Sequence, residues 1–375
     1  MTEPLSAIDF GLPSDQGGKD IGIFLPMANG GWILSSTAPP LDGSYAYNRE
    51  TAILADTLGL DFILSMAKWR GYGGPRDHWG TSLDAQILMA GLAEATQRVK
   101  VWTTVHTLLQ NPAVSAKMMA TLDQISGGRA GLNVVTGSYK AEFDQMNAWP
   151  EGIGHDDRYD LAAEWITAVK RLWSEPRVTL DGKYVKLKDC CSEPKPVSNP
   201  RPFLVCAGTS SKGMQFTLEE MDAIFLTGNG LDHLAATSRD AKSRARAFGR
   251  RIKTYTMMTI VFGETDTEAH DKEALYRAGL DEEALWGMMR AYGFLDSEIG
   301  KENAFVASAR SSFMTPRIVG TPDKVAAEAI ALMEAAELDG LMLIFPDYLA
   351  DMKVFAAEVL PKIRAHFPAV AEAVA

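Results

Sequence analysis

Asn133 places a polar side chain inside an otherwise apolar strand. The segment is SGGRAGLNVVTG (126–137), in which a helix ends at Gly127 and Gly128 and a strand is predicted from about 131 to 135. A buried amide without a partner is costly, and ligands of parallel sheets bind at the carboxyl ends of the strands. Asn133 is therefore a candidate ligand contact. A neighbouring backbone group is the alternative partner.

Two other segments carry groups that suit a phosphate. The segment AGTSSKG (207–213) joins a predicted strand to a helix, so that Ser210 lies beside the free amides of the helix start. Arg158 and Tyr159 open a helix after a long loop, and arginine offers a forked, permanently charged donor. A cation at a helix start is electrostatically unfavourable, which favours an anionic ligand there. The alternatives are a helix cap at Ser210 and a solvated side chain at Arg158.

Lys68 and His106 follow the ends of two predicted strands. Three roles are open to Lys68: a Schiff-base lysine, a contact to flavin or oxygen, or a surface ammonium. His106 is either an acid or base or a packed ring with one satisfied nitrogen. The six histidines lack the spacing of metal ligands, and the chain has no nucleophile elbow and no P-loop. These patterns favour a bound cofactor as the source of the chemistry.

The bulk composition limits the partners and the location. The net charge of −11 argues against nucleic acid and anionic membranes as partners. Cys190, Cys191 and Cys206 are interpreted as reduced thiols. The polar N-terminus has no leader pattern, and no apolar run is long enough to span a membrane. A cytoplasmic protein is expected.

Strand and helix patterns alternate eight times along the chain. The strands are predicted at 21–25, 61–66, 99–104, 131–135, 203–207, 223–227, 254–262 and 341–345. Between the third and fourth strands, Asn111 and Pro112 begin a helix whose apolar positions Val114, Met118, Leu122 and Ile125 follow a helical period. Eight such units predict an α/β fold, a (β/α)8 TIM barrel formed by one domain over residues 1–375.

Three insertions interrupt this alternation. They cover about 137–157, 178–190 and 280–318, and the second is predicted to be a hairpin around Asp181 and Gly182. Long insertions at the top of a barrel usually form lids or substrate walls.

Six motifs occur in an order and at a spacing that resemble the bacterial luciferase-like flavin monooxygenases. They are NGGWILSSTAP (29–39), LSMAKWRGYGG (64–74), ATLDQISGGRAGLNVVTG (120–137), EFDQMNAWP (142–150), DDRYD (156–160) and CAGTSSKGM (206–214). The resemblance covers nearly the whole chain and is closest to the pyrimidine (uracil) monooxygenase branch.

The resemblance implies a set of site residues. An FMN site would include Ala67, Lys68, Asn133, Glu142, Arg158, Tyr159 and Ser210, the last three at the phosphate. An oxygen pocket would be formed by Leu64, Met66, Lys68, Thr104, Asn133 and Val135. His106, Trp69, Tyr72 and about 280–312 depart from the branch, so Trp69 and His106 are candidates for the substrate pocket.

The resemblance also implies an activity. Reduced FMN would come from a separate NAD(P)H-dependent flavin reductase, since the chain has no dinucleotide fingerprint. With O2, the enzyme would oxygenate a small organic molecule, first a cyclic amide such as uracil with cleavage of a C–N bond. The alternatives are a sulfone, sulfonate or haloarene substrate, a deazaflavin-dependent oxidoreductase, a Schiff-base lyase using Lys68, and a flavin-binding protein without turnover. A homo-oligomer is expected.

Overall fold

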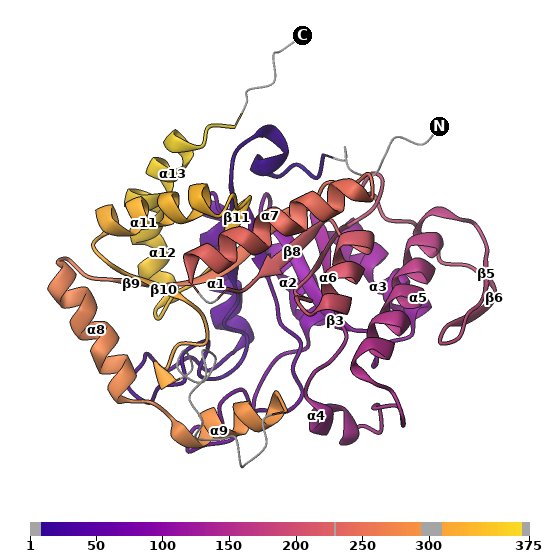
Figure 1. Cartoon of the computed structure of the whole chain (residues 1–375), viewed down its shortest axis with the longest axis horizontal. Helices are drawn as coiled ribbons and strands as arrows, with labels where there is room; N and C mark the ends of the chain where they lie inside the picture. The colour runs from indigo at the N-terminus through magenta and orange to yellow at the C-terminus, as the bar shows by residue number, and fades with distance from the viewer. Residues whose placement is uncertain (1–8, 229, 294–309, 370–375) are drawn as a thin grey trace, which may run out of the picture.

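Eight parallel strands close into a barrel surrounded by helices (Figure 1). The computed structural model describes residues 9–228, 230–293 and 310–369. The barrel strands are β1 (Asp20–Phe24), β2 (Phe62–Leu64), β3 (Lys100–His106), β4 (Ala130–Val135), β7 (Phe203–Cys206), β8 (Ala223–Leu226), β9 (Lys253–Phe262) and β11 (Gly340–Ile344). Their order is β9-β11-β1-β2-β3-β4-β7-β8, and pairing of β8 with β9 closes the ring. The predicted (β/α)8 barrel is therefore confirmed.

The helices follow the strands as crossover connections. Their bounds are η2 (Pro13–Gln16), α1 (Tyr45–Thr57), α2 (Ala85–Ala95), α3 (Pro112–Ile125), α4 (Lys140–Asp144), α5 (His155–Ser174), α6 (Ser211–Glu220), α7 (Leu231–Ala247), α8 (Asp266–Ala278), α9 (Glu282–Ala291), α11 (Pro322–Ala335), α12 (Tyr348–Val354), η3 (Phe355–Val359) and α13 (Leu360–His366). Side-chain caps explain several starts: Asn111 accepts a hydrogen bond from the amide of Ala113, and Ser210 from that of Gly213. In the described part of the chain, no helix is long and apolar enough to cross a membrane.

An aromatic layer fills the lower half of the barrel lumen, which is the half nearest the amino ends of the strands. The rings of Phe62 and Trp102 stack with centroids 4.1 Å apart, and Tyr255 and Phe203 pack against Trp102. A Cβ at Gly131 would lie 2.4 Å from the Trp102 ring, so glycine is required opposite this indole. Because strand side chains alternate, Thr104 and His106 point inward with Trp102, and Asn133 and Val135 point inward with Gly131.

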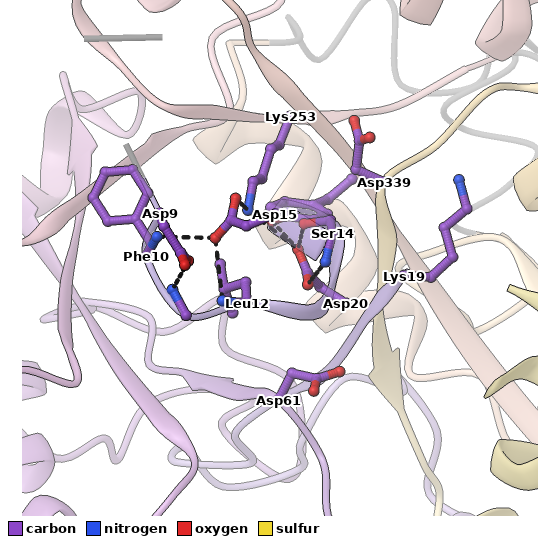
Figure 2. Close-up of polar contacts among 12 residues, drawn as sticks. Asp9, Phe10, Leu12, Ser14, Asp15, Lys19, Asp20, Asp61, Lys253 and Asp339 are labelled. Carbon is purple, nitrogen blue, oxygen red and sulfur yellow. Dashed lines mark hydrogen bonds and ion pairs between the residues drawn. The ribbon is translucent and has the colours of Figure 1, made fainter. Parts of the chain in front are cut away.

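The N-terminal segment closes the lower end of the barrel (Figure 2). The buried Asp20 carboxylate accepts hydrogen bonds from the Ser14 hydroxyl, the Ser14 amide at 3.0 Å and the Tyr255 hydroxyl at 2.6 Å. Asp15 pairs with Lys253 and accepts the amides of Phe10 and Leu12. Burial raises the pKa of Asp20, although its donors and Lys253 oppose the shift. Ligands therefore approach the lumen from the opposite end.

The three insertions lie outside the barrel strands. The hairpin is confirmed as β5 (Val178–Asp181) and β6 (Lys186–Cys190), and its turn is held by Glu164 of α5. The 137–157 insertion contains α4, and the third contains α9; both lie away from the two chain ends in Figure 1. In α9, a Cβ at Gly287 would lie 1.8 Å from the Tyr72 carbonyl oxygen, so the helix rests directly on the loop after β2. Residues 294–309 of this insertion lie outside the described residues.

The structure also corrects the predicted element list. A further strand, β10 (Arg317–Gly320), pairs with β9 outside the closed ring, where the sequence pattern indicated only a loose insertion. Only Ile318 and Val319 of this strand are apolar, between an arginine and a glycine, so it lacks the apolar run of the barrel strands. Strand β3 extends to His106 instead of ending at Thr104, since His106 pairs in register with Val135 of β4. On α3, Leu122 is buried, whereas Val114, Met118 and Ile125 of the same period are exposed.

Candidate functional site

Asn133, Thr104 and Ser65 form a hydrogen-bonded chain in the upper lumen, the half of the barrel interior nearest the carboxyl ends of the strands. Thr104 and Asn133 are register partners on β3 and β4. The Asn133 Nδ2 donates to Thr104 Oγ1 at 3.0 Å, and the Thr104 hydroxyl donates to the Ser65 carbonyl oxygen. Asn133 is 8% exposed, and its Oδ1 has no partner among the described residues. Buried unpaired acceptors cost about 1–3 kcal/mol, so this oxygen is suited to a ligand.

His106 lies beside this chain as a neutral ring. Its Nε2 is 3.2 Å from the Ala67 carbonyl oxygen, and because that oxygen can only accept, Nε2 carries the hydrogen. The ring packs against Trp69 and Phe143, with centroids 5.5 Å and 5.1 Å away. Burial lowers the pKa of His106 to about 4, against an opposing contribution from the hydrogen bond to Ala67 and from Glu142. His106 is therefore not an acid at neutral pH.

This depressed pKa makes the folded apoprotein sensitive to acid. The unfolded chain binds the His106 proton near pH 6.5, whereas the folded chain binds it near pH 4, so stability falls as the pH drops through this window. Between pH 7 and 5 we expect His106 to contribute a loss of roughly 2 kcal/mol in the free energy of unfolding. Urea unfolding at both pH values should show a correspondingly smaller drop in His106→Leu. An equal drop in both proteins would show that folding does not lower the pKa of His106.

Lys68 and Glu142 form a buried ion pair across the mouth of the barrel. Lys68 Nζ is 3.2 Å from Glu142 Oε2, and the two side chains are 8% and 3% exposed. The second carboxylate oxygen accepts the amides of Trp69 at 2.7 Å and Arg70 at 3.2 Å. Glu142 thus joins α4 to the loop after β2.

The surroundings of Lys68 favour a charged ammonium. The rings of Tyr72 and Tyr139 each lie 4.7 Å from Nζ, as in a cation–π contact. Burial lowers the pKa of Lys68, and Glu142 opposes that shift. A Schiff-base lysine must lose its proton, which this pairing disfavours. The surface-ammonium interpretation is wrong, because the side chain is buried.

Apolar side chains line the remaining wall of the upper lumen. Leu64 and Met66 are buried, and Val135 is half-buried in register with His106. Ala67 presents its carbonyl to His106, whereas Trp69 is 38% exposed at the rim. The six predicted oxygen-pocket residues and the two predicted substrate-wall residues therefore occur in one region.

A second group of predicted residues meets where β4, α5 and α6 converge. The Tyr159 hydroxyl interacts with Ser210 and Thr136, and it packs so closely on Gly213 that a Cβ there would lie 2.6 Å from it. Ser210 caps α6, which confirms the cap interpretation. Arg158 stacks on Trp149 at 4.7 Å, and its buried Nε has no partner among the described residues. A hydroxyl, helix amides and a guanidinium without a carboxylate partner in that part of the chain suit a phosphate.

The strand β4 connects the two groups. Asn133 and Thr136 are three residues apart, which is roughly 10 Å along an extended chain. An elongated ligand with a flat polar ring at one end and a phosphate at the other matches this layout. A flavin mononucleotide has that form, and the unpaired Asn133 oxygen and Arg158 nitrogen are positions where it would supply missing partners.

Several residues of the candidate site were not predicted from the sequence. Ser65 contributes only a backbone oxygen, and Phe143, Trp149 and Tyr139 contribute rings from the 137–157 insertion. Phe143 and Trp149 lie within the EFDQMNAWP motif, which was a usable signal. Among the described residues, no group of three or more His, Cys, Asp or Glu is placed to hold a metal ion.

Comparison with known proteins agrees with this geometry. The family model of the luciferase-like monooxygenases matches residues 20–339. Pyrimidine monooxygenase RutA of Methylobacterium radiotolerans is 37% identical over 92% of this chain and 91% of its own length. The protein of the same name from Acinetobacter baylyi is 34% identical over 94% and 96%.

Solved structures share the fold at lower identity. Riboflavin lyase RcaE, solved with modified FMN and riboflavin, superposes with a TM-score of 0.83 at 24% identity, covering 93% of this chain and 92% of that one. EDTA monooxygenase EmoA from Chelativorans gives 0.78 at 22%, covering 95% and 96%. An F420-dependent secondary alcohol dehydrogenase gives 0.69 at 19%, covering 92% and 99%. The family match and the close relatives together place this chain in the luciferase-like family of flavin-dependent monooxygenases.

Proposed function

We propose that this enzyme uses reduced FMN and O2 to oxygenate a pyrimidine or a similar small cyclic amide, with cleavage of a C–N bond. The observation that supports the cofactor is the polar track along β4, from the unpaired Asn133 oxygen to the unpaired Arg158 nitrogen. The substrate class is supported by relatives of 34–37% identity that are named pyrimidine monooxygenases.

The proposed cofactor site assigns each residue a physical task. Arg158, Tyr159 and Ser210 hold the phosphate, and Asn133, which Thr104 orients, presents its amide to the isoalloxazine. Leu64, Met66 and Val135 exclude water from the place where oxygen reacts. Glu142 keeps Lys68 charged and ties the two loops of the mouth together. Bound reduced flavin would supply the electrons that activate O2.

The substrate would lie against the part of the pocket wall whose residues differ from those of the pyrimidine monooxygenase branch. His106 and Trp69 stand at this wall, and His106 Nδ1 is a second buried acceptor without a partner among the described residues. Ring N–H groups of a pyrimidine are donors that such an acceptor recognises. We also propose that residues 1–375 act as one domain, insertions included.

The decisive measurement is the product formed for each O2 consumed, with and without substrate. The enzyme, FMN, NAD(P)H and a separate flavin reductase are combined, and uracil is compared with an alkanesulfonate and a dialkyl sulfone. We expect a ring-opened product with uracil only, whereas the O2 consumed with the other two compounds should appear as hydrogen peroxide. Sulfite release from the sulfonate would support the alternative substrate class. Calorimetric binding of a deazaflavin in place of FMN would support the oxidoreductase alternative, which some neighbours of the same fold represent.

An exposed apolar strip favours self-association. Val114, Met118 and Ile125 of α3 are 54%, 37% and 45% exposed, and Ile87 of the adjacent α2 is 72% exposed. Positions 114, 118, 121 and 125 follow the alternating spacing of four and three residues that packs one helix on another. The 14-residue α3 is about 21 Å long and lies against α2, so the strip runs along a helix-length surface.

Charged side chains on this strip should therefore prevent two copies of the protein from forming a dimer. We expect the double variant Ile87→Asp and Met118→Asp to run as a monomer in light scattering, while the unmodified enzyme runs as a dimer. Leu275→Asp on α8 is a matched control, since Leu275 is equally apolar and 52% exposed. A monomeric native enzyme, or dimers in all three proteins, would contradict this surface.

A further inference from the structure

A small cavity lies at the lower end of the barrel, beneath the aromatic layer. It has a volume of about 90 Å³, and its walls include Trp102, Phe203, Lys100, Arg129 and Arg201. The two rings belong to the aromatic layer, and Thr104 follows Trp102 by one inward position on β3. The layer therefore separates this cavity from the upper lumen and from the candidate cofactor site.

Lys100 brings an ammonium group without a partner to this cavity. It is the first residue of β3, and its half-buried side chain points inward with that of Trp102. A Cβ built at Gly11 would lie 3.1 Å from Lys100 Nζ, so the ammonium rests on the N-terminal segment. It makes no hydrogen bond or ion pair with any described residue. An anion in the cavity would replace the acceptors that burial has removed.

Two guanidinium groups add positive charge to the walls of the cavity. Arg129 has no carboxylate at ion-pair distance in the described part of the chain, because its five N–H groups donate to uncharged oxygen atoms of Ala93, Thr96, Val99 and Ser126. Arg201 is paired with Asp222 at 2.6 Å. Asp9 is the one carboxylate among the lining residues. Three cations set against the carboxylates of Asp9 and Asp222 leave an excess of one positive charge.

We propose that this cavity binds a small oxyanion such as phosphate or sulfate, which accepts hydrogen bonds from Lys100 while Arg129 supplies further positive charge. Lys100 offers three N–H donors, and the exposed Asn199 adds an amide at the rim. Burial lowers the pKa of Lys100, Arg129 lowers it further, and Asp15 and Asp9 oppose the shift. A bound anion would keep the ammonium charged.

The size of the cavity limits the ligand to such an ion. Its volume is far below the roughly 300 Å³ at which pockets for drug-sized ligands begin. The hydroxyl of Ser198, which also lines the cavity, already donates to Asp123 at 2.6 Å, so it is not counted among the donors to the anion. The site does not involve the proposed cofactor, and it stands whether or not FMN binds above the aromatic layer.

The bound anion would fasten the N-terminal segment to the barrel. Gly11 lies on Lys100, and the ring of Phe10 packs on that of Phe203 with centroids 4.6 Å apart. Phe10 and Leu12 line the same cavity. A ligand that binds the folded chain and not the unfolded chain stabilises the fold by mass action. The resistance of the protein to unfolding should therefore rise with the concentration of the anion.

The test is thermal unfolding of the full chain in phosphate and in chloride at equal ionic strength. It is carried out without FMN and in an Arg158→Ala background, because free phosphate would otherwise also bind at the proposed cofactor-phosphate position. At a phosphate concentration tenfold above the dissociation constant, we expect the midpoint of unfolding to lie about 2 °C above that in chloride. Sulfate should act as phosphate does, since both are small tetrahedral oxyanions.

Two further substitutions in this background locate the anion. Lys100→Met removes the ammonium but keeps the length of the side chain, and it should abolish the rise in phosphate. Lys100→Gln should do the same, and it replaces the methionine variant if circular dichroism shows that variant to be unfolded. Lys188→Met is the matched control, because Lys188 is exposed on the β5–β6 hairpin and removes the same charge. This control should keep the full rise.

Each outcome decides the proposal. An equal rise in a folded Lys100→Met protein would overturn it, as would a loss in Lys188→Met that matches the loss in Lys100→Met. A rise in the native protein that is absent from Arg158→Ala would place the phosphate at the proposed cofactor site and leave the lower cavity without an anion. The absence of any difference between phosphate and chloride in both the native protein and Arg158→Ala would also reject the site.

Discussion

Asn133→Ala is expected to lower product formation at least a hundredfold. The Asn133 and Thr104 pair lies beside the apolar side chains of Leu64, Met66 and Val135 in the lumen wall. Asn133 Nδ2 keeps one hydrogen besides the one that it donates to Thr104, and a preorganised donor that faces developing negative charge in a dry site contributes roughly 2.7–4 kcal/mol to catalysis. Removal of that group should therefore have a large effect on the chemical step.

Cofactor binding should change much less in this variant. We expect the affinity for reduced FMN to stay within about tenfold, or roughly 1.4 kcal/mol, because the phosphate end of the site is untouched. Reduced flavin should still be oxidised by O2, with hydrogen peroxide released in place of product. The measurement is the ratio of product formed to oxygen consumed. If a well-folded variant keeps the native ratio, Asn133 has no part in the oxygen chemistry and only satisfies Thr104.

Arg158→Ala should weaken FMN binding about tenfold to a hundredfold and leave riboflavin almost unaffected. The guanidinium stacks on Trp149, its Nε is buried without a partner among the described residues, and burial lowers the pKa of Arg158. A dianionic phosphate would supply the missing partner, and one hydrogen bond to a charged group contributes about 1.5–3 kcal/mol. Riboflavin has no phosphate, so the comparison isolates this contact.

Calorimetry of both ligands in both proteins provides the result. Arg171→Ala is the matched control, because Arg171 lies at the other end of α5 and pairs with Glu175. This control should bind FMN as the native enzyme does. An equal loss of FMN and riboflavin affinity in Arg158→Ala would assign Arg158 to the packing of Trp149 instead of to the phosphate.

The order of elements was predictable because it depends on local patterns. Each barrel strand is a short apolar run, and each following helix begins at a recognisable cap such as Asn111 or Ser210. The repeat of eight such units determines the closed barrel, since parallel strands need right-handed crossovers. The strand β10 was not predictable: its sequence RIVG has only two apolar residues in a row, and it pairs with β9 only after the chain has folded.

In the candidate site, too, some residues were predictable from local sequence patterns and others were not. Asn133, Arg158, Tyr159 and Ser210 stood out by residue type at strand or helix ends, and the structure places them along one track on β4, α5 and α6. Glu142 was identified only through the family motifs, whereas Lys68 also stood out because it follows a predicted strand. Their ion pair joins residues 74 positions apart, and no local pattern encodes such a distance.

By itself, the sequence determined the barrel, the family and most of the residue types of the site, because periodicity and motifs are local properties of the chain. Only the tertiary structure decided how those groups are used. It committed the Thr104 hydrogen to Ser65, left an oxygen of Asn133 unpaired, and buried His106 as a neutral ring. It also exposed the apolar strip of α3, whose period alone resembles that of a buried helix. Hydrogen-bond direction, burial and pKa depend on neighbours that the fold brings from distant parts of the chain.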